Sequence, residues 1–180
     1  MATMTRRTWF WAVAALLASG AVAAAADNLR IVPIVHDDEV LVSVDFTDAY
    51  TPNVHDAISS GLRTTVSYDV ELRMHVPLWV DRTVATSVVE ASDQYDNLTR
   101  RHTLLRSVDG HVEETSVTED ENVARRWLTS LSRVPLCHTS RLEPARDYYV
   151  RIRARIRPTG VSLLGLASAA IGQAKLTYIP

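Results

Sequence analysis

Alternating apolar and polar positions recur along most of the chain and predict a β-rich fold. The clearest run is 66–76, which has the two-residue period of a strand with one buried face. Strands 82–91 and 98–108 are expected to flank a polar turn at 92–97, and Asp109-Gly110 is a hairpin signal. The order of these segments predicts an antiparallel meander. Further strands are expected at 29–35, 40–46, 111–117, 134–137, 148–157 and 174–179.

Two segments have the 3.6-residue period of amphipathic helices instead. The first is predicted to begin with Thr51 as its N-cap and to end at Gly61. The second is predicted to begin with a capping box from Thr118 to Glu121, and its apolar stripe reaches Leu131. The fold class is therefore α+β: a mainly antiparallel sheet, either a curved sheet or an open sandwich, with two short helices packed on it.

The first 26 residues have the order of a bacterial signal peptide. Arg6 and Arg7 precede an apolar stretch at 9–18, and small residues at 21–26 follow it. We place cleavage after Ala26, which leaves 27–180 as one β-rich domain in the periplasm. Two alternatives remain open. An uncleaved leader of about 20 residues would anchor the domain to the inner membrane and be its sole membrane contact, and Arg6-Arg7 also resembles a twin-arginine signal.

Charge and cysteine usage restrict the class of protein further. Without the leader the domain has 17 basic and 21 acidic side chains, a formal charge of −4. This disfavours a nucleic-acid partner, because such binding depends on neutralising phosphates. Cys137 is the sole cysteine, so an intrachain disulfide is impossible, and we interpret it as a small buried apolar residue.

Several segments resemble a bacterial exported family catalogued as domain of unknown function 4390. They are 57–72 (AISSGLRTTVSYDVEL), the Trp79-Val80-Asp81 corner, 95–102 (YDNLTRRH) and 148–153 (YYVRIR), in the same order and spacing. The resemblance implies an exported domain with no established activity, often encoded near two-component sensor kinases. Our own hypothesis for the partner is an envelope or sensor-kinase protein.

One strand has an unusual composition, since four arginines alternate with apolar residues: Arg151, Arg153, Arg155 and Arg157. A regular strand would project them from one face at about 6.6 to 7 Å spacing. Guanidinium groups suit carboxylates and phosphates, so we predict that this row binds an anionic lipid head group, a polyanion or an acidic partner. Two alternatives remain open. The arginines would pair across strands with acids such as Glu113, Glu114, Asp69 or Glu71, or they would protect a sheet edge from aggregation.

No motif in the sequence indicates catalysis, a metal or a cofactor. The six histidines have no short ligand spacing. Cys137 and His138 are adjacent, so in a strand their side chains point to opposite faces. The sequence has no Gly-x-Ser-x-Gly elbow and no glycine-rich phosphate loop. We therefore predict no catalytic residue, no metal ligand and no cofactor.

These patterns together favour a non-catalytic partner-binding or sensor-associated domain of the periplasm. An alternative class, a binder or carrier of an anionic amphiphile, predicts an apolar cavity of roughly 300 Å³ or more beneath the arginine strand. An enzyme, the least favoured class, predicts a cleft with convergent and strongly perturbed titratable groups.

Overall fold

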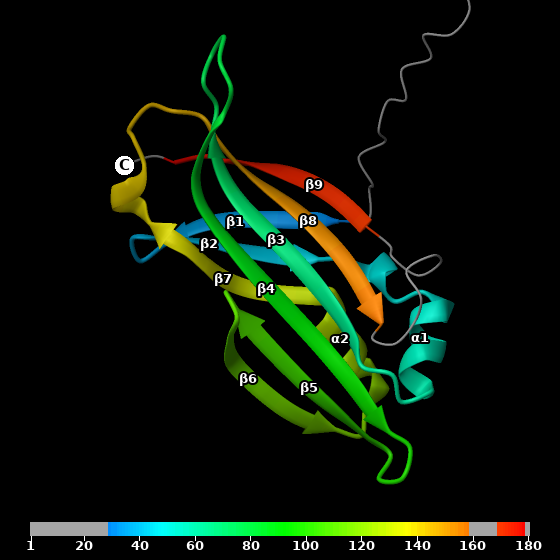
Figure 1. Ribbon diagram of the computed structural model, residues 1–180. Coiled ribbons are helices and arrows are strands. Elements are labelled where there is room, and N and C mark those ends of the chain that lie inside the picture. Colours follow the sequence, from blue (N-terminus) through cyan, green and yellow to red (C-terminus); the bar gives the residue numbers. More distant parts are fainter. Residues whose placement is uncertain (1–28, 159–168, 179–180) are drawn as a thin grey trace, which may run out of the picture.

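The computed structural model describes residues 29–158 and 169–178, which fold into two antiparallel sheets and two helices (Figure 1). The larger sheet has the strand order β6-β5-β4-β3-β8-β9 and the smaller one β1-β2-β7. The strands are β1 Arg30–His36, β2 Glu39–Asp45, β3 Thr64–Met74, β4 Arg82–Asp96, β5 Arg101–Val108, β6 His111–Thr118, β7 Ser130–His138, β8 Tyr148–Pro158 and β9 Ala169–Leu176. The helices are α1 Pro52–Ser59 and α2 Glu121–Thr129, with short 3-10 turns at Thr47–Ala49 and Thr139–Arg141. The predicted signal peptide and cleavage site lie outside the described residues.

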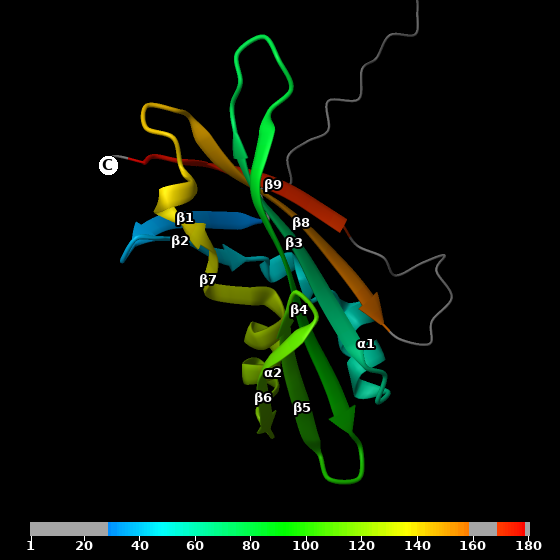
Figure 2. The same ribbon diagram turned by 60° about the vertical axis from the view of Figure 1, so that its left-hand side comes forward.

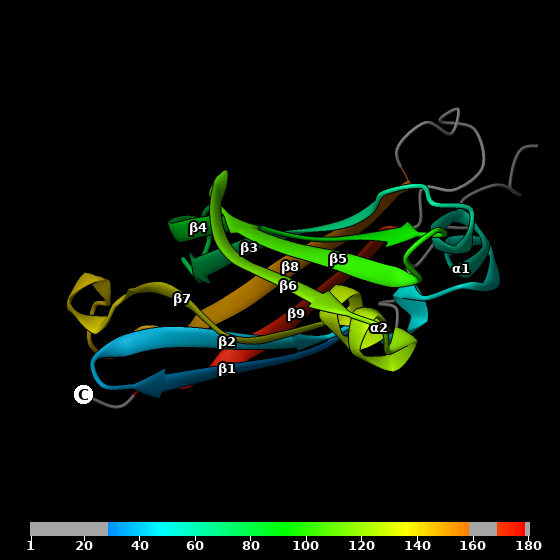
Figure 3. The same cartoon turned by 90° about the horizontal axis from the view of Figure 1, so that it is seen from below.

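The two sheets face each other as an open sandwich, which confirms the predicted α+β class (Figure 3). They approach closely where β9 meets β1, because Gly172 packs directly against Leu29 and Ile31. A Cβ at Gly172 would come within 3.1 Å of both side chains. Elsewhere α2 packs against both sheets and fills the space between them. The core therefore lies between the inner faces of the sheets and α2.

Several local predictions are confirmed by the backbone. Thr51 caps α1, since its hydroxyl oxygen accepts a bond from the Val54 N–H at 3.3 Å. Gly61 follows α1 with a φ of 79°, the left-handed conformation that glycine adopts without strain. Asp109 and Gly110 form the β5–β6 turn with φ values of 49° and 83°. Strands β3 to β6 follow one another as the predicted meander.

The turn predicted at 92–97 is wrong, because most of it belongs to β4. That strand pairs with β5 as far as Asp96 opposite Arg101. The polar residues 92–96 favour a turn by composition, but Asp93 is fully buried and bonded to His102. Cross-strand pairing therefore overrides local preference, and the turn itself is 97–100.

The capping box predicted for the second helix is also wrong. Asp120 is the N-cap, and its Oδ1 accepts a bond from the Asn122 N–H at 2.8 Å. The Thr118 hydroxyl instead accepts a bond from the Asp120 N–H. The helix ends at Thr129, so Leu131 contributes to the core from β7.

No helix of the described part of the chain is both long and apolar enough to cross a membrane.

Candidate functional site

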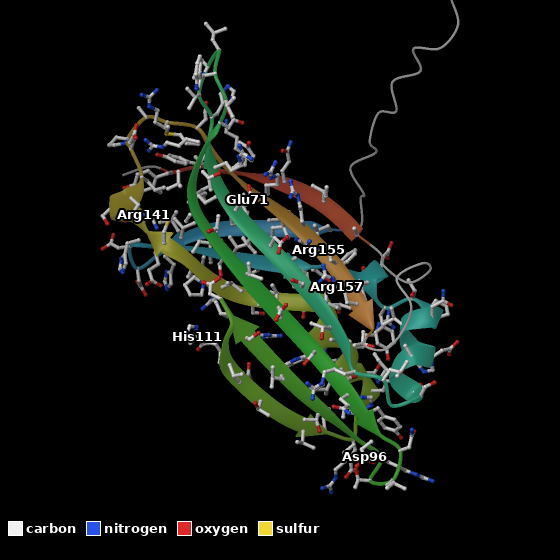
Figure 4. The ribbon with its side chains drawn as sticks, in the orientation of Figure 1. Glu71, Asp96, His111, Arg141, Arg155 and Arg157 are labelled. Carbon is white, nitrogen blue, oxygen red and sulfur yellow. The ribbon has the colours of Figure 1, made fainter. Side chains whose placement is uncertain are left out.

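The predicted arginine row lies on the outer face of the larger sheet (Figure 4). Strand β8 pairs antiparallel with β3, and its side chains alternate between core and solvent. The arginines therefore share one face, as the alternation predicted. Their apolar neighbours, fully buried in the core, are Val150, Ile152, Ala154 and Ile156.

Two of the four arginines are engaged by carboxylates of β3. Arg151 Nη2 lies 2.6 Å from Glu71 Oε2, and Arg155 Nη2 lies 2.5 Å from Asp69 Oδ2. These two arginines therefore follow the alternative in which the row pairs across strands, with Asp69 and Glu71 as the acids. Arg153 and Arg157 are exposed and make no ion pair with any residue the structure describes. The row is therefore half neutralised within its own sheet.

The layer beneath the arginine row consists of hydrophobic core. The inner side chains of β8 pack with those of β3, including Tyr68 and Val70, in one continuous cluster. The inward-facing side chains of both strands are essentially inaccessible to solvent. These side chains fill the space beneath the arginine row in which an amphiphile would have to bind.

The hairpin connecting β3 and β4 carries an exposed apolar tip, formed by Leu78, Trp79 and Val80. Their exposed fractions are 104%, 81% and 74%. Figures 1 and 2 show this hairpin projecting beyond both sheets. Exposed apolar clusters of this kind mark interaction sites in soluble proteins. We call these three residues the hairpin tip.

The hairpin tip rests on a network centred on Asp81. Asp81 Oδ1 accepts a bond from the Val76 N–H at 3.2 Å and lies 3.0 Å from His75 Nδ1. Its Oδ2 accepts a 2.7 Å bond from the Tyr149 hydroxyl on β8. These bonds, that of Tyr149 foremost, lower the pKa of the Asp81 carboxyl. Leu78 has a φ of 63°, in the left-handed region, and the Val76–Asp81 bond joins the two sides of this turn.

Several basic side chains around the base of the hairpin are paired with carboxylates. Arg82 Nη2 lies 2.6 Å from Glu143 Oε1, and Lys175 Nζ lies 3.2 Å from Asp147 Oδ1. Glu143 Oε2 also lies 3.5 Å from Arg146 Nε, so this carboxylate pairs with two arginines.

The remaining sequence candidates lie apart from one another. Cys137 is half-buried on β7, and burial raises the pKa of its thiol. Among the residues described, no three His, Cys, Asp or Glu side chains gather as a metal site. The hairpin tip was not predicted as an exposed surface, although an apolar Leu-Trp-Val run inside a turn was a signal for it.

Comparison with known proteins identifies the family. Residues 23–164 match the sequence pattern of the domain of unknown function DUF4390. The chain belongs to this family. The matched region of the DUF4390 domain includes both the hairpin tip and the arginine row. No curated protein and no solved structure matches the chain.

Proposed function

We propose that this DUF4390 protein is an exported, non-catalytic domain of the periplasm that binds another envelope protein through its hairpin tip. The observation that carries the proposal is the exposure of Leu78, Trp79 and Val80 on a projecting, hydrogen-bonded turn. Leaving three large apolar side chains in water forfeits roughly 1.5–3 kcal/mol of burial energy for each. A partner with an apolar pocket would recover that energy.

The chemistry of the hairpin tip favours a protein partner over a bilayer or a nucleic acid. Tryptophan is enriched at the centres of protein interfaces, where a few anchors carry most of the binding energy. The Asp81 network reduces the entropy that the turn loses on binding. Arg82 and Lys175 are paired with carboxylates, which weakens their attraction for an anionic lipid or a phosphate. The expected partner is an envelope protein, such as the extracytoplasmic part of a sensor kinase.

Site-specific photo-crosslinking in cells tests the proposal directly. A photoreactive amino acid replaces Trp79 in the full chain and, in a matched control, Leu98 in the β4–β5 turn. Leu98 is 94% exposed, so the two positions differ in place and not in accessibility. We expect one discrete protein adduct from position 79 and none from position 98. Equal adducts from both positions, or none from position 79, would contradict the proposal.

A binding measurement with the purified partner then quantifies the contact. Trp79→Ala should weaken binding by about 2 kcal/mol or more, roughly thirtyfold in Kd, as anchor residues do. Leu98→Ala should leave the Kd unchanged. A Kd that Trp79→Ala does not alter would place the interface elsewhere on the domain.

The binding role of the arginine row stays a prediction, and the same assay tests it. The double variant Arg153→Gln, Arg157→Gln removes the two unpaired guanidinium groups while keeping the ion pairs of Arg151 and Arg155. Weaker binding by this variant, at unchanged stability, would extend the interface onto the outer face of the sheet. Unchanged binding would leave the row as a solvated face.

A further inference from the structure

A second region of the molecule has the features of a small-molecule site, at the opposite end of β4 from the hairpin tip. A cavity of about 490 Å³ lies where α1, α2 and the ends of β4 and β5 meet. Its walls include Tyr50, Tyr95, His102, Glu119 and Glu121. The volume is within the range of ligand-binding pockets, roughly 300–1,000 Å³. We call it the β4–β5 cavity; Asp96, labelled in Figure 4, marks this end of β4.

The wall of the β4–β5 cavity includes a buried histidine whose second ring nitrogen is unused. His102 is 5% exposed, and its Nδ1 lies 2.9 Å from Oδ2 of the fully buried Asp93. With Asp93 ionised and the ring neutral, Nδ1 donates to the carboxylate and Nε2 is an acceptor. Nε2 has no hydrogen-bond partner among the residues the structure describes. Asp93 thus fixes the tautomer that leaves Nε2 available to a ligand.

Two glutamates of the cavity wall provide further acceptors. Glu121 Oε1 accepts a bond from the Tyr50 hydroxyl at 3.2 Å and lies 3.4 Å from His55 Nε2. Glu119 Oε1 accepts a bond from Arg101 Nε at 3.0 Å. Each glutamate keeps a second carboxylate oxygen for which no bond is recorded. The N–H groups of a ligand could bond to these oxygens, while Arg100 and Ser59 offer donors on the same wall.

Side chains of both charges act on the cavity wall, and the negative ones dominate at Tyr50. Burial raises the pKa of Tyr50, and the negative charges of Glu121 and Asp93 raise it further, while Arg125 opposes them. Arg100 is the sole basic residue of the cavity wall. The aromatic faces of Tyr50 and Tyr95 also attract cations, and the Arg125 guanidinium already lies 5.3 Å from the Tyr50 ring.

We propose that the β4–β5 cavity binds a small organic amine in its protonated form, held by His102 Nε2 and the carboxylates of Glu119 and Glu121. A primary ammonium group has three N–H donors, which matches these three acceptors. The apolar part of the amine would lie against Tyr95 and Ile58. This inference does not depend on the partner proposed above, since 15 residues of β4 separate the two regions by roughly 45 Å.

Three probes of similar size and different charge test the inference on the full mature chain. They are phenethylamine, phenethyl alcohol and phenylacetate, and the readouts are calorimetry and the NMR signals of the histidine rings. We expect phenethylamine to bind and to shift the His102 signals, which a His102→Gln variant identifies. The alcohol should bind about tenfold more weakly or worse, and the acid should not bind.

A matched pair of variants separates the site from general charge. Glu121→Gln should weaken binding of phenethylamine about tenfold, while Glu113→Gln on the exposed strand β6 should leave it unchanged. Glu121 is half-exposed, so its replacement should leave the fold intact even where His102→Gln does not. The inference would be overturned if the amine did not bind or if all three probes bound equally. It would also be overturned if the two glutamine variants bound the amine equally, or if the His102 signals responded to Zn²⁺ alone. Trp79→Ala should not change amine binding, so the amine site and the partner site can each be disproved without affecting the other.

Discussion

The Tyr68 hydroxyl donates a 2.6 Å hydrogen bond to the carbonyl oxygen of Leu128 inside the core. Tyr68 lies on β3 and Leu128 in the last turn of α2, where carbonyl groups have no partner within the helix. Both side chains are buried, and burial raises the pKa of the Tyr68 hydroxyl, which therefore stays protonated as a donor. This one bond connects the larger sheet to the end of the helix.

Removal of that hydroxyl should destabilise the domain measurably. Tyr68→Phe leaves the Leu128 carbonyl buried without its partner, which costs on the order of 1–3 kcal/mol of the free energy of unfolding. Urea unfolding monitored by tryptophan fluorescence measures the loss. Tyr178→Phe is the control, because no hydrogen bond of its hydroxyl is recorded within the described chain. Equal stability of the two variants would show that the bond contributes nothing.

Arg106 makes a second polar contact between the larger sheet and α2. Its guanidinium carbon lies 4.2 Å from the centre of the Trp127 ring, and Nη2 donates to the carbonyls of Trp127 and Ser130 at 3.2 and 3.4 Å. A lysine is a point charge without the planar fork, so it cannot reproduce the stacking and both bonds. Burial also lowers the pKa of the Arg106 guanidinium, and a lysine there would lose its proton more readily.

We therefore expect Arg106→Lys to lower the free energy of unfolding by about 1–2 kcal/mol. Chemical denaturation of the variant and of Arg101→Lys measures the difference. Arg101 is more than half exposed and pairs with Glu119 on the surface, so its replacement should cost little. A cost for Arg101→Lys equal to that for Arg106→Lys would contradict the role assigned to the stacking.

The alternation of side chains predicted most strands because burial on one face imposes a two-residue period on any sequence. The same period predicted that the arginines of β8 share one face. It carried no information on their partners, since Glu71 and Arg151 are 80 residues apart and meet only through strand register. Strand register is set by the complete pattern of pairing and bulges, which a single strand does not encode.

The β4–β5 cavity was missed for a related reason. The sequence indicated a turn at 92–97, and a turn would have left Asp93 in solvent. Pairing of β4 with β5 instead buries Asp93 beside His102, nine residues away across the hairpin. An acidic residue flanked by Ser92 and Gln94 resembles part of a loop, and only the partner strand makes it a buried residue that is hydrogen-bonded to His102.

The single thiol gives a direct measure of burial on β7. Burial raises the pKa of Cys137, so a smaller fraction is thiolate near pH 8, and the thiolate is the reactive form. We expect native protein to react with a disulfide reagent about tenfold more slowly than protein unfolded in urea. The rate should rise as the pH rises, because deprotonation is then less costly. Equal rates for native and unfolded protein would mean that Cys137 is accessible and unperturbed.

The Asp81 network should make the stability of the hairpin depend on pH. Hydrogen bonds lower the pKa of this carboxyl in the folded state below the unfolded value of about 3.9. Its contribution is therefore present above that value and is lost as the pH falls through the folded pKa. Asp81→Asn should lower the urea midpoint near pH 7, and the difference from wild type should shrink as the pH falls below the unfolded pKa of about 3.9.

Unfolding curves over this pH range, together with the fluorescence of the protein, test the role of Asp81. Asp48→Asn is the control, since Asp48 is exposed and makes no recorded bond within the described residues. If Asp81 orders the hairpin tip, Asp81→Asn should also weaken partner binding. The effect requires no contact between this carboxylate and the partner, because the carboxylate acts through its bonds to Val76 and Tyr149. A pH-independent difference between Asp81→Asn and wild type would instead assign the loss to packing, because only a titrating carboxylate produces the narrowing.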